Sequence, residues 1–194
     1  PRGFMSIKQF NGNYQPAEDR LMFRFNTQDD SEYRLWLSRR VTLFILVATE
    51  HLVEKRLAQT HGAPVAKAIT EFAEDGAKSQ TDFSVQYQEA MNFPIGQDLM
   101  LVTDVQCTMV QIEGIDLMSL DLAIQSKGNL NLKLPLSILL TMRLLLERLA
   151  DIAQWGRASM NINLDMHPSD PAEKNNDRED TDALELNLQT KKLH

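Results

Sequence analysis

The side chains that could carry out catalysis are few in this sequence, and they form no recognisable motif. The chain has no GxGxxG or GxxxxGK(S/T) phosphate-binding loop, no HExxH zinc motif and no GxSxG nucleophile motif. His51 directly follows Glu50 on an expected helix, where adjacent side chains point in different directions and do not readily share a metal ion. Cys107 is the single cysteine, so an internal disulfide is excluded, and no histidine stands near it as a base. We therefore predict neither an enzyme nor a bound metal or cofactor.

Alternating apolar and polar residues indicate a β-hairpin near the start of the chain. Leu21–Phe25 and Tyr33–Leu37 place apolar side chains at every second position, and Asn26–Ser31 between them is rich in turn-forming residues. From Val41 the apolar spacing becomes helical, which predicts a helix of roughly 17 residues directly after the hairpin.

The outer face of this hairpin carries a candidate binding surface made of Met22, Arg24, Arg34 and Trp36. A register with Phe25 opposite Tyr33 buries the apolar face, and it also sets the two arginines in direct opposition, at a cost of about 0.2–1 kcal/mol. Two arginines beside a large aromatic side chain could bind an anion or a partner protein. The alternative is internal: Glu32 or Glu18 neutralises the arginines, and a linking helix covers Trp36.

The same order of elements returns 97 residues later without a gap. The corresponding positions are Leu21 and Met118, Phe23 and Leu120, Phe25 and Leu122, Tyr33 and Leu130, Leu35 and Leu132, Leu37 and Leu134, and Glu50 and Glu147. We expect a second hairpin there, with its turn at Ser126–Asn129 and a helix from Leu136 to Trp155 that begins after Pro135. We interpret the match as a duplication; coincidence is the alternative, because units of a hairpin and a helix are common.

Each half is expected to begin with one more strand, at Met5–Tyr14 and at Leu99–Ile112, and Pro64–Ser79 has the spacing of a linking helix. The predicted fold class is α+β. Two pseudo-symmetric β-β-β-α repeats, about 5–58 and 99–155, form an antiparallel sheet that packs on two long apolar helices. A helical linker, 62–93, joins the repeats within a single domain, 5–156.

The long helices are apolar over more of their surface than contact with one sheet requires. The segment Leu136–Leu149 has almost no polar stripe in its first three turns, whereas a helix on one side of a sheet needs an apolar stripe of only about 100°. Either the two helices cover each other, or this surface also meets another chain, in which case a homodimer is the expected assembly. The candidate interface residues are Leu136, Leu140 and Leu144.

The chain is acidic, with a formal net charge of −7, and its end is expected to be an acidic, largely disordered tail, 157–194. Two alternating runs, Met160–Met166 and Leu184–Leu188, flank the most acidic stretch, and either could add to a sheet edge or bind a partner as a strand. No apolar stretch is long enough to span a bilayer, and a single cysteine is typical of a reducing compartment. We therefore predict a cytoplasmic protein that does not bind membranes.

These observations favour a non-enzymatic interaction module, a small cytoplasmic adaptor or regulator that binds a protein partner or associates with itself. In architecture, tandem units of strands followed by a helix resemble PUR-type and Whirly-type repeats, and the resemblance implies binding of single-stranded nucleic acid. The residues available for such binding are Arg20, Arg24, Arg34, Trp36, Arg39 and Arg40. Binding of single-stranded nucleic acid favours exposed aromatic residues in basic surroundings, but aromatic residues make up only 7% of this chain and its net charge is negative. We therefore rank nucleic-acid binding second, as the alternative function.

Overall fold

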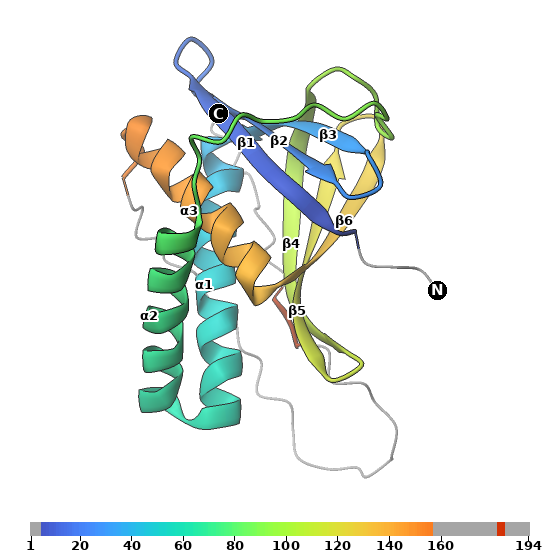
Figure 1. Ribbon diagram of the computed structural model, residues 1–194. Helices are drawn as coiled ribbons and strands as arrows, with labels where there is room; N and C mark the ends of the chain where they lie inside the picture. The colour runs from blue at the N-terminus through green and yellow to red at the C-terminus, as the bar shows by residue number, and fades with distance from the viewer. Residues whose placement is uncertain (1–4, 157–181, 185–194) are drawn as a thin grey trace, which may run out of the picture.

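The protein has an α+β fold in which helices lie against a mixed β-sheet (Figure 1). The computed structural model describes residues 5–156 and the backbone of residues 182–184. Along these residues the chain forms three strands, two helices, three strands, one helix and a short final strand. The predicted α+β class is confirmed at this level.

The first three strands form an antiparallel meander of β1 (Ile7–Gln15), β2 (Arg20–Thr27) and β3 (Glu32–Ser38). The register expected for the hairpin is confirmed, since Phe25 lies opposite Tyr33 and their rings stack 4.9 Å apart. The same register sets Arg24 opposite Arg34 and Met22 opposite Trp36 on the other face. Binary alternation and turn chemistry were sufficient to specify this pairing.

A second antiparallel meander consists of β4 (Met100–Ile112), β5 (Ile115–Ile124) and β6 (Gly128–Pro135). A short strand, β7 (Asp182–Leu184), pairs antiparallel with Cys107–Met109 of β4. The sheet order is therefore β1-β2-β3-β4-β5-β6, with β7 beside β4 and with β1 and β6 at the two ends of this path.

The expectation of a purely antiparallel sheet is wrong at the junction of the two meanders. β3 and β4 run parallel, with Leu35 opposite Met100 and Trp36 opposite Leu101. The physical reason is the long connection between them, because a chain that returns through helices can enter the sheet in the same direction as the strand it left. The alternation of apolar and polar residues along a strand shows which face is buried, but it does not determine whether the neighbouring strand runs parallel or antiparallel.

Three helices, α1 (Arg39–His61), α2 (Ala63–Gln80) and α3 (Leu136–Ile152), occur in the described residues. The first is 23 residues long, longer than the roughly 17 expected, because its C-terminal half continues along α2 and reaches β5, where Arg56 pairs with Asp116 at 2.9 Å (Figure 1). The Ser38 hydroxyl caps α1 by accepting a hydrogen bond from Val41 N at 3.3 Å. The linking helix is confirmed as α2, but the rest of the expected helical linker, 81–93, is not helical. Pro135 stands at the start of α3 as expected, and α3 ends at Ile152 and not at Trp155.

The core lies between one face of the sheet and the helices α1 and α3. α1 packs on β3 and β4, while α3 packs on β1, β5 and β6, and α2 packs on both other helices (Figure 1). The largest fully buried side chains include Phe25, Phe44, Leu52, Leu120 and Met142. Among the described helices, none combines the length and the apolarity required to cross a membrane.

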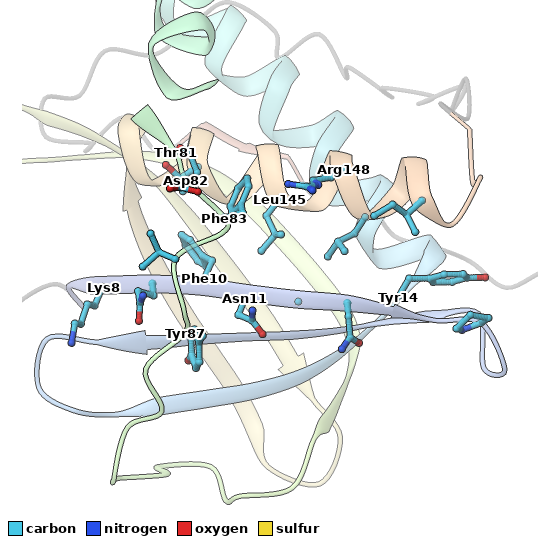
Figure 2. Close-up of a pocket in the computed structure, with 18 residues that line it drawn as sticks. Lys8, Phe10, Asn11, Tyr14, Thr81, Asp82, Phe83, Tyr87, Leu145 and Arg148 are labelled. Carbon is cyan, nitrogen blue, oxygen red and sulfur yellow. The ribbon is translucent and has the colours of Figure 1, made fainter. Parts of the chain in front are cut away.

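The covering segment, residues 81–97, crosses from the helices to the opposite face of the first meander. It leaves the end of α2 beside α3, passes the edge of β1 and continues over β2 and β3 (Figures 1 and 2). Gln86 O accepts a hydrogen bond from Gln9 Nε2 at 3.4 Å, and Gln88 O accepts one from Asn26 Nδ2 at 2.6 Å. The first meander is therefore covered on both faces.

The expectation of a disordered tail falls on residues 157–181 and 185–194, which lie outside the described residues. The alternating run Met160–Met166 lies outside them as well. Of the run Leu184–Leu188, only Leu184 is described, and its backbone belongs to β7.

Candidate functional site

The residues predicted as a binding surface lie together on the outer face of β2 and β3. Met22 and Trp36 are opposed in the register, and the Arg20 guanidinium lies 4.0 Å from the centre of the Trp36 ring. Arg20 also forms an ion pair with Glu18. The element that covers this meander is the covering segment and not the linking helix, which packs on α1 and α3.

The opposed arginines are neutralised inside the protein. Glu32 is completely buried, and its Oε1 accepts a hydrogen bond from Arg34 Nε at 2.6 Å and lies 3.8 Å from Arg24 Nη1. Glu89 of the covering segment adds a second carboxylate, 3.0 Å from Arg24 Nη1. A buried carboxylate between two guanidinium groups removes the repulsion that the register alone would create. The internal alternative from the sequence is confirmed for Glu32.

Aromatic side chains of the covering segment complete this cluster. The Tyr87 ring lies 4.2 Å from the Arg24 guanidinium, and the Phe93 ring lies 4.8 Å from that of Arg34. Ala90 N donates to Glu32 Oε2 at 3.0 Å, which ties the backbone of the segment to the buried carboxylate. Burial, followed by the nearby charge of Glu32, raises the pKa of the Tyr87 hydroxyl, so it stays protonated at neutral pH.

Of the three residues predicted as an interface, Leu140 and Leu144 lie on α3 where α2 approaches it, and Leu136 packs against the core. Leu140 is buried, whereas Leu136 and Leu144 are half-buried. Ala77 and Lys78 of α2 line the same small hollow as Leu140 and Leu144. Part of the apolar surface seen in the sequence is thus covered by the linking helix.

A groove lies between β1, α3 and the first half of the covering segment (Figure 2). Its volume is about 590 Å³, within the range typical of ligand sites. The apolar lining comes from all three walls and includes Phe10, Tyr14, Phe83, Val85, Leu145 and Ile152. Val85 and Ile152 are 61% and 59% exposed, so the rim of the groove is apolar and open to solvent.

The groove follows the free edge of the sheet. β1 pairs with β2 alone among the described strands, so every second backbone N–H and C=O group of β1 points away from the sheet. The covering segment forms hydrogen bonds with β1 side chains at Lys8 and Gln9, at one end of the strand. The stretch Phe10–Gln15 is left beside the groove without a strand partner on that side.

Gly12 allows α3 to lie close to β1. A Cβ atom at this position would lie 2.8 Å from Met22 O and 2.9 Å from Leu149 Cδ1, which is closer than real Cβ contacts. The missing side chain therefore sets the spacing between the edge strand and the helix. Gly12 was not singled out from the sequence, although an isolated glycine within an expected strand could have signalled such close approach.

Three side chains hold the far end of the groove. The Asp19 carboxylate accepts hydrogen bonds from Trp155 Nε1 at 2.6 Å and from the Tyr14 hydroxyl at 2.9 Å. These bonds, that of Trp155 first, lower the pKa of Asp19 and stabilise its charged form. The rings of Tyr14 and Trp155 meet edge to face at 5.8 Å, which fixes the end of β1 against the residues that follow α3.

The single carboxylate of the groove lining is bound by its own segment. Asp82 accepts hydrogen bonds from Ser84 N and Oγ at 2.8 and 2.6 Å, and these bonds lower its pKa, so it is a poor proton acceptor. Cys107 lies in the core, where burial raises the pKa of its thiol to about 12. The described residues contain no cluster of three or more histidine, cysteine or carboxylate side chains able to hold a metal ion.

Sequence reasoning missed the groove because one of its three walls gives no periodic signal. The covering segment has neither helical nor strand spacing, so its path over the edge of β1 could not be read from the residues. The apolar excess of α3 was noticed, but part of it serves the groove, through Leu145 and Ile152. The chain matches no known protein family, and neither curated proteins nor solved structures show significant similarity to it.

Proposed function

We propose that this protein is a non-enzymatic interaction module that binds an extended segment of a partner protein along β1. One observation carries the proposal: the open apolar groove lies beside a sheet edge whose backbone groups have no strand partner. A peptide added to such an edge gains main-chain hydrogen bonds, and its alternate side chains enter the neighbouring groove. The helix α3 supplies the wall for those side chains, through Leu145 and Ile152.

The alternative function, binding of single-stranded nucleic acid, has less support from the contacts. Arg20, Arg24 and Arg34 pair with carboxylates of this chain. Arg39 and Arg40 donate hydrogen bonds to Trp155 O and Thr103 O at 2.9 and 2.7 Å. Arginines with internal acceptors must exchange these contacts for phosphates, so we expect no measurable binding of a short oligonucleotide at physiological salt. Tight, salt-sensitive binding would reverse the order of the two functions.

The test of the proposed function begins with a displayed library of random nonapeptides selected on the full chain. The tightest binders are synthesised with a fluorescent label, and their Kd is measured by anisotropy. Ile152→Asp and Val85→Asp each place a charge on the exposed rim of the groove, and we expect each to weaken binding at least tenfold. A tenfold loss corresponds to about 1.4 kcal/mol of binding free energy, which we attribute to the lost apolar contact with the peptide.

Two exposed apolar residues of α2 provide matched controls. Val65 and Phe72 are 50% and 82% exposed and lie away from the groove, so Val65→Asp and Phe72→Asp should leave the Kd unchanged. Failure to enrich any peptide would contradict the proposal. A loss of binding in the α2 variants, with the groove variants intact, would place the site on α2 instead.

We also propose that the two β-β-β-α units arose by duplication and are related by a pseudo-two-fold. Glu50 and Glu147 occupy corresponding positions at the offset of 97 residues. Both lie beside the buried Arg143 guanidinium, at 3.5 and 3.3 Å from its Nη2. A contact shared by corresponding positions of α1 and α3 supports the duplication. A crystal structure would test it: residues 5–58 should superpose on residues 99–155 after a rotation of about 180°, and failure to superpose would contradict the duplication.

Self-association through α3 is a further part of the proposal, with a homodimer as the simplest form and the cytoplasm as the expected compartment. Leu136 and Leu144 remain half-buried, so they are available to a second chain. Light scattering over a dilution series measures the assembly. Leu144→Asp should yield a folded monomer; a wild-type protein that is monomeric at every concentration would contradict the dimer.

A further inference from the structure

The charges around the groove differ from those of the whole chain. The full chain carries a formal net charge of −7, whereas the groove is lined by the cationic side chains of Lys8 and Arg148 and by a single carboxylate, that of Asp82. The Asp82 carboxylate is engaged by Ser84. With two cations and one carboxylate, the lining carries one net positive charge on an otherwise acidic protein.

Neither cation has an acidic partner in residues 5–156. Lys8 Nζ donates to the neutral Gln88 side chain at 2.9 Å, and Arg148 has neither a hydrogen bond nor an ion pair in this part of the chain. All other arginines of residues 5–156 bind a carboxylate or a backbone carbonyl, as Arg56 does with Asp116 at 2.9 Å. Arg148 is thus the exception, and it lies at the groove.

The two cations stand on different walls. Lys8 lies at the start of β1, and Arg148 extends from α3 on the opposite wall near the middle of the groove (Figure 2). A strand placed between the walls would pass both. Its alternate side chains would face the apolar lining at Phe10, Leu145 and Ile152, and the remaining side chains would face solvent or the cations.

We propose that the segment bound along β1 is acidic, with apolar side chains at alternate positions against α3 and with intervening carboxylates attracted by the exposed cations Lys8 and Arg148. This inference rests on the proposed function and names the chemistry of its partner. Exposed ion pairs strengthen association by about two- to fivefold each, so two pairs distinguish an acidic segment from a neutral one. A basic segment meets two repulsions in the same places.

Three synthetic nonapeptides test the charge preference on the full chain. Each carries valine at alternate positions, and the intervening positions carry glutamate, glutamine or lysine. At low salt the glutamate peptide should bind at least tenfold tighter than the lysine peptide, with the glutamine peptide between them. The difference should shrink as salt is raised, because exposed ion pairs are screened.

A variant with the charges of the groove reversed provides the second test. The double variant Lys8→Glu and Arg148→Glu should reverse the order of the three peptides. Lys133→Glu, on the opposite edge strand β6, is the matched control and should leave the order unchanged. Neither change removes a core contact, since Lys8 and Arg148 are exposed.

The outcomes separate this inference from the proposed function. Equal affinities for the three peptides, or tighter binding of the lysine peptide, would overturn the acidic preference while leaving the groove as the binding site. If none of the three binds, the composition of the library-selected peptides decides: acidic enrichment supports the inference, and a neutral or basic composition overturns it. A library that yields no binder at all would overturn the proposed function itself.

Discussion

The two end strands of the sheet expose their edges in different ways. β6 ends at Pro135, carries Lys133 and runs directly into α3. Proline and lysine are the residues that commonly prevent an exposed edge from pairing with another chain. In β1, the comparable features are Lys8 and a register irregularity between Ile7 and Gln9, and both lie where the covering segment crosses the edge. The remaining stretch, Phe10–Gln15, has neither a charge nor a proline.

This difference indicates which edge is available for binding. A protein must protect an exposed strand edge from unwanted pairing, and in β6 Lys133 and Pro135 provide this protection. β1 keeps an unprotected stretch, Phe10–Gln15, beside an apolar groove, and the covering segment binds the strand at its other end, at Lys8 and Gln9. The structure therefore distinguishes an edge that is closed to a partner strand from one that can accept it.

The largest expected effect comes from removing the carboxylate that holds the covering segment. Glu32→Ala leaves the Arg24 and Arg34 guanidinium groups without their buried partner, and both are only about a fifth to a quarter exposed. We expect a loss of about 2–4 kcal/mol in the free energy of unfolding, measured by urea denaturation. Asp121→Ala on the outer face of β5 is the control and should change stability by less than about 0.5 kcal/mol. Equal losses in the two variants would contradict the account of the covered meander.

A somewhat smaller effect is expected from closing the gap between β1 and α3. Gly12→Val forces a side chain against Met22 O and Leu149, and such overpacking costs about 1–3 kcal/mol. Because α3 must move, library-selected peptides should also bind more weakly. Asn13→Val changes the neighbouring exposed residue, which lies on the other face of β1, and should be nearly neutral for stability. Normal stability and peptide affinity in Gly12→Val would show that this contact does not set the groove.

The smallest effect is expected when the pH is lowered and Asp19, at the end of the groove, becomes protonated. Hydrogen bonds from Trp155 and Tyr14 lower the pKa of Asp19, so the stabilisation they provide is present above the unfolded pKa of an aspartate. It is lost as the pH falls through the lower, folded pKa. In a Trp36→Phe background, Trp155 fluorescence should therefore change at acidic pH, and Asp19→Asn should remove most of that change. Identical acid profiles with and without Asp19→Asn would rule out this linkage.

The sequence was most informative where local patterns determine structure. The hairpin register of β2 and β3 followed from alternation and turn residues, and the linking helix followed from its spacing. The parallel junction of β3 and β4 did not follow, because face periodicity carries no information on strand direction. Four predicted binding residues were placed on the correct face, but the buried Glu32 and the covering segment supply contacts for two of them.

The groove depends on contacts between residues far apart in the chain. It forms where Phe10, Phe83 and Leu145 meet, and no local pattern relates these positions. Gly12 could have given a local signal of close approach, without naming the element that approaches. The candidate site could therefore be recognised only from the folded arrangement of β1, α3 and the covering segment.

Hydrogen exchange at the two sheet edges tests the central claim most directly. The backbone amides of the full chain are followed by NMR with and without the tightest library-selected nonapeptide at saturation. If the peptide adds to β1, every second amide within Phe10–Gln15 should exchange at least tenfold more slowly, because only the outward N–H groups gain a partner. The amides of β6 should be unchanged. Slowed exchange in β6, or binding without slowed exchange in β1, would contradict the account.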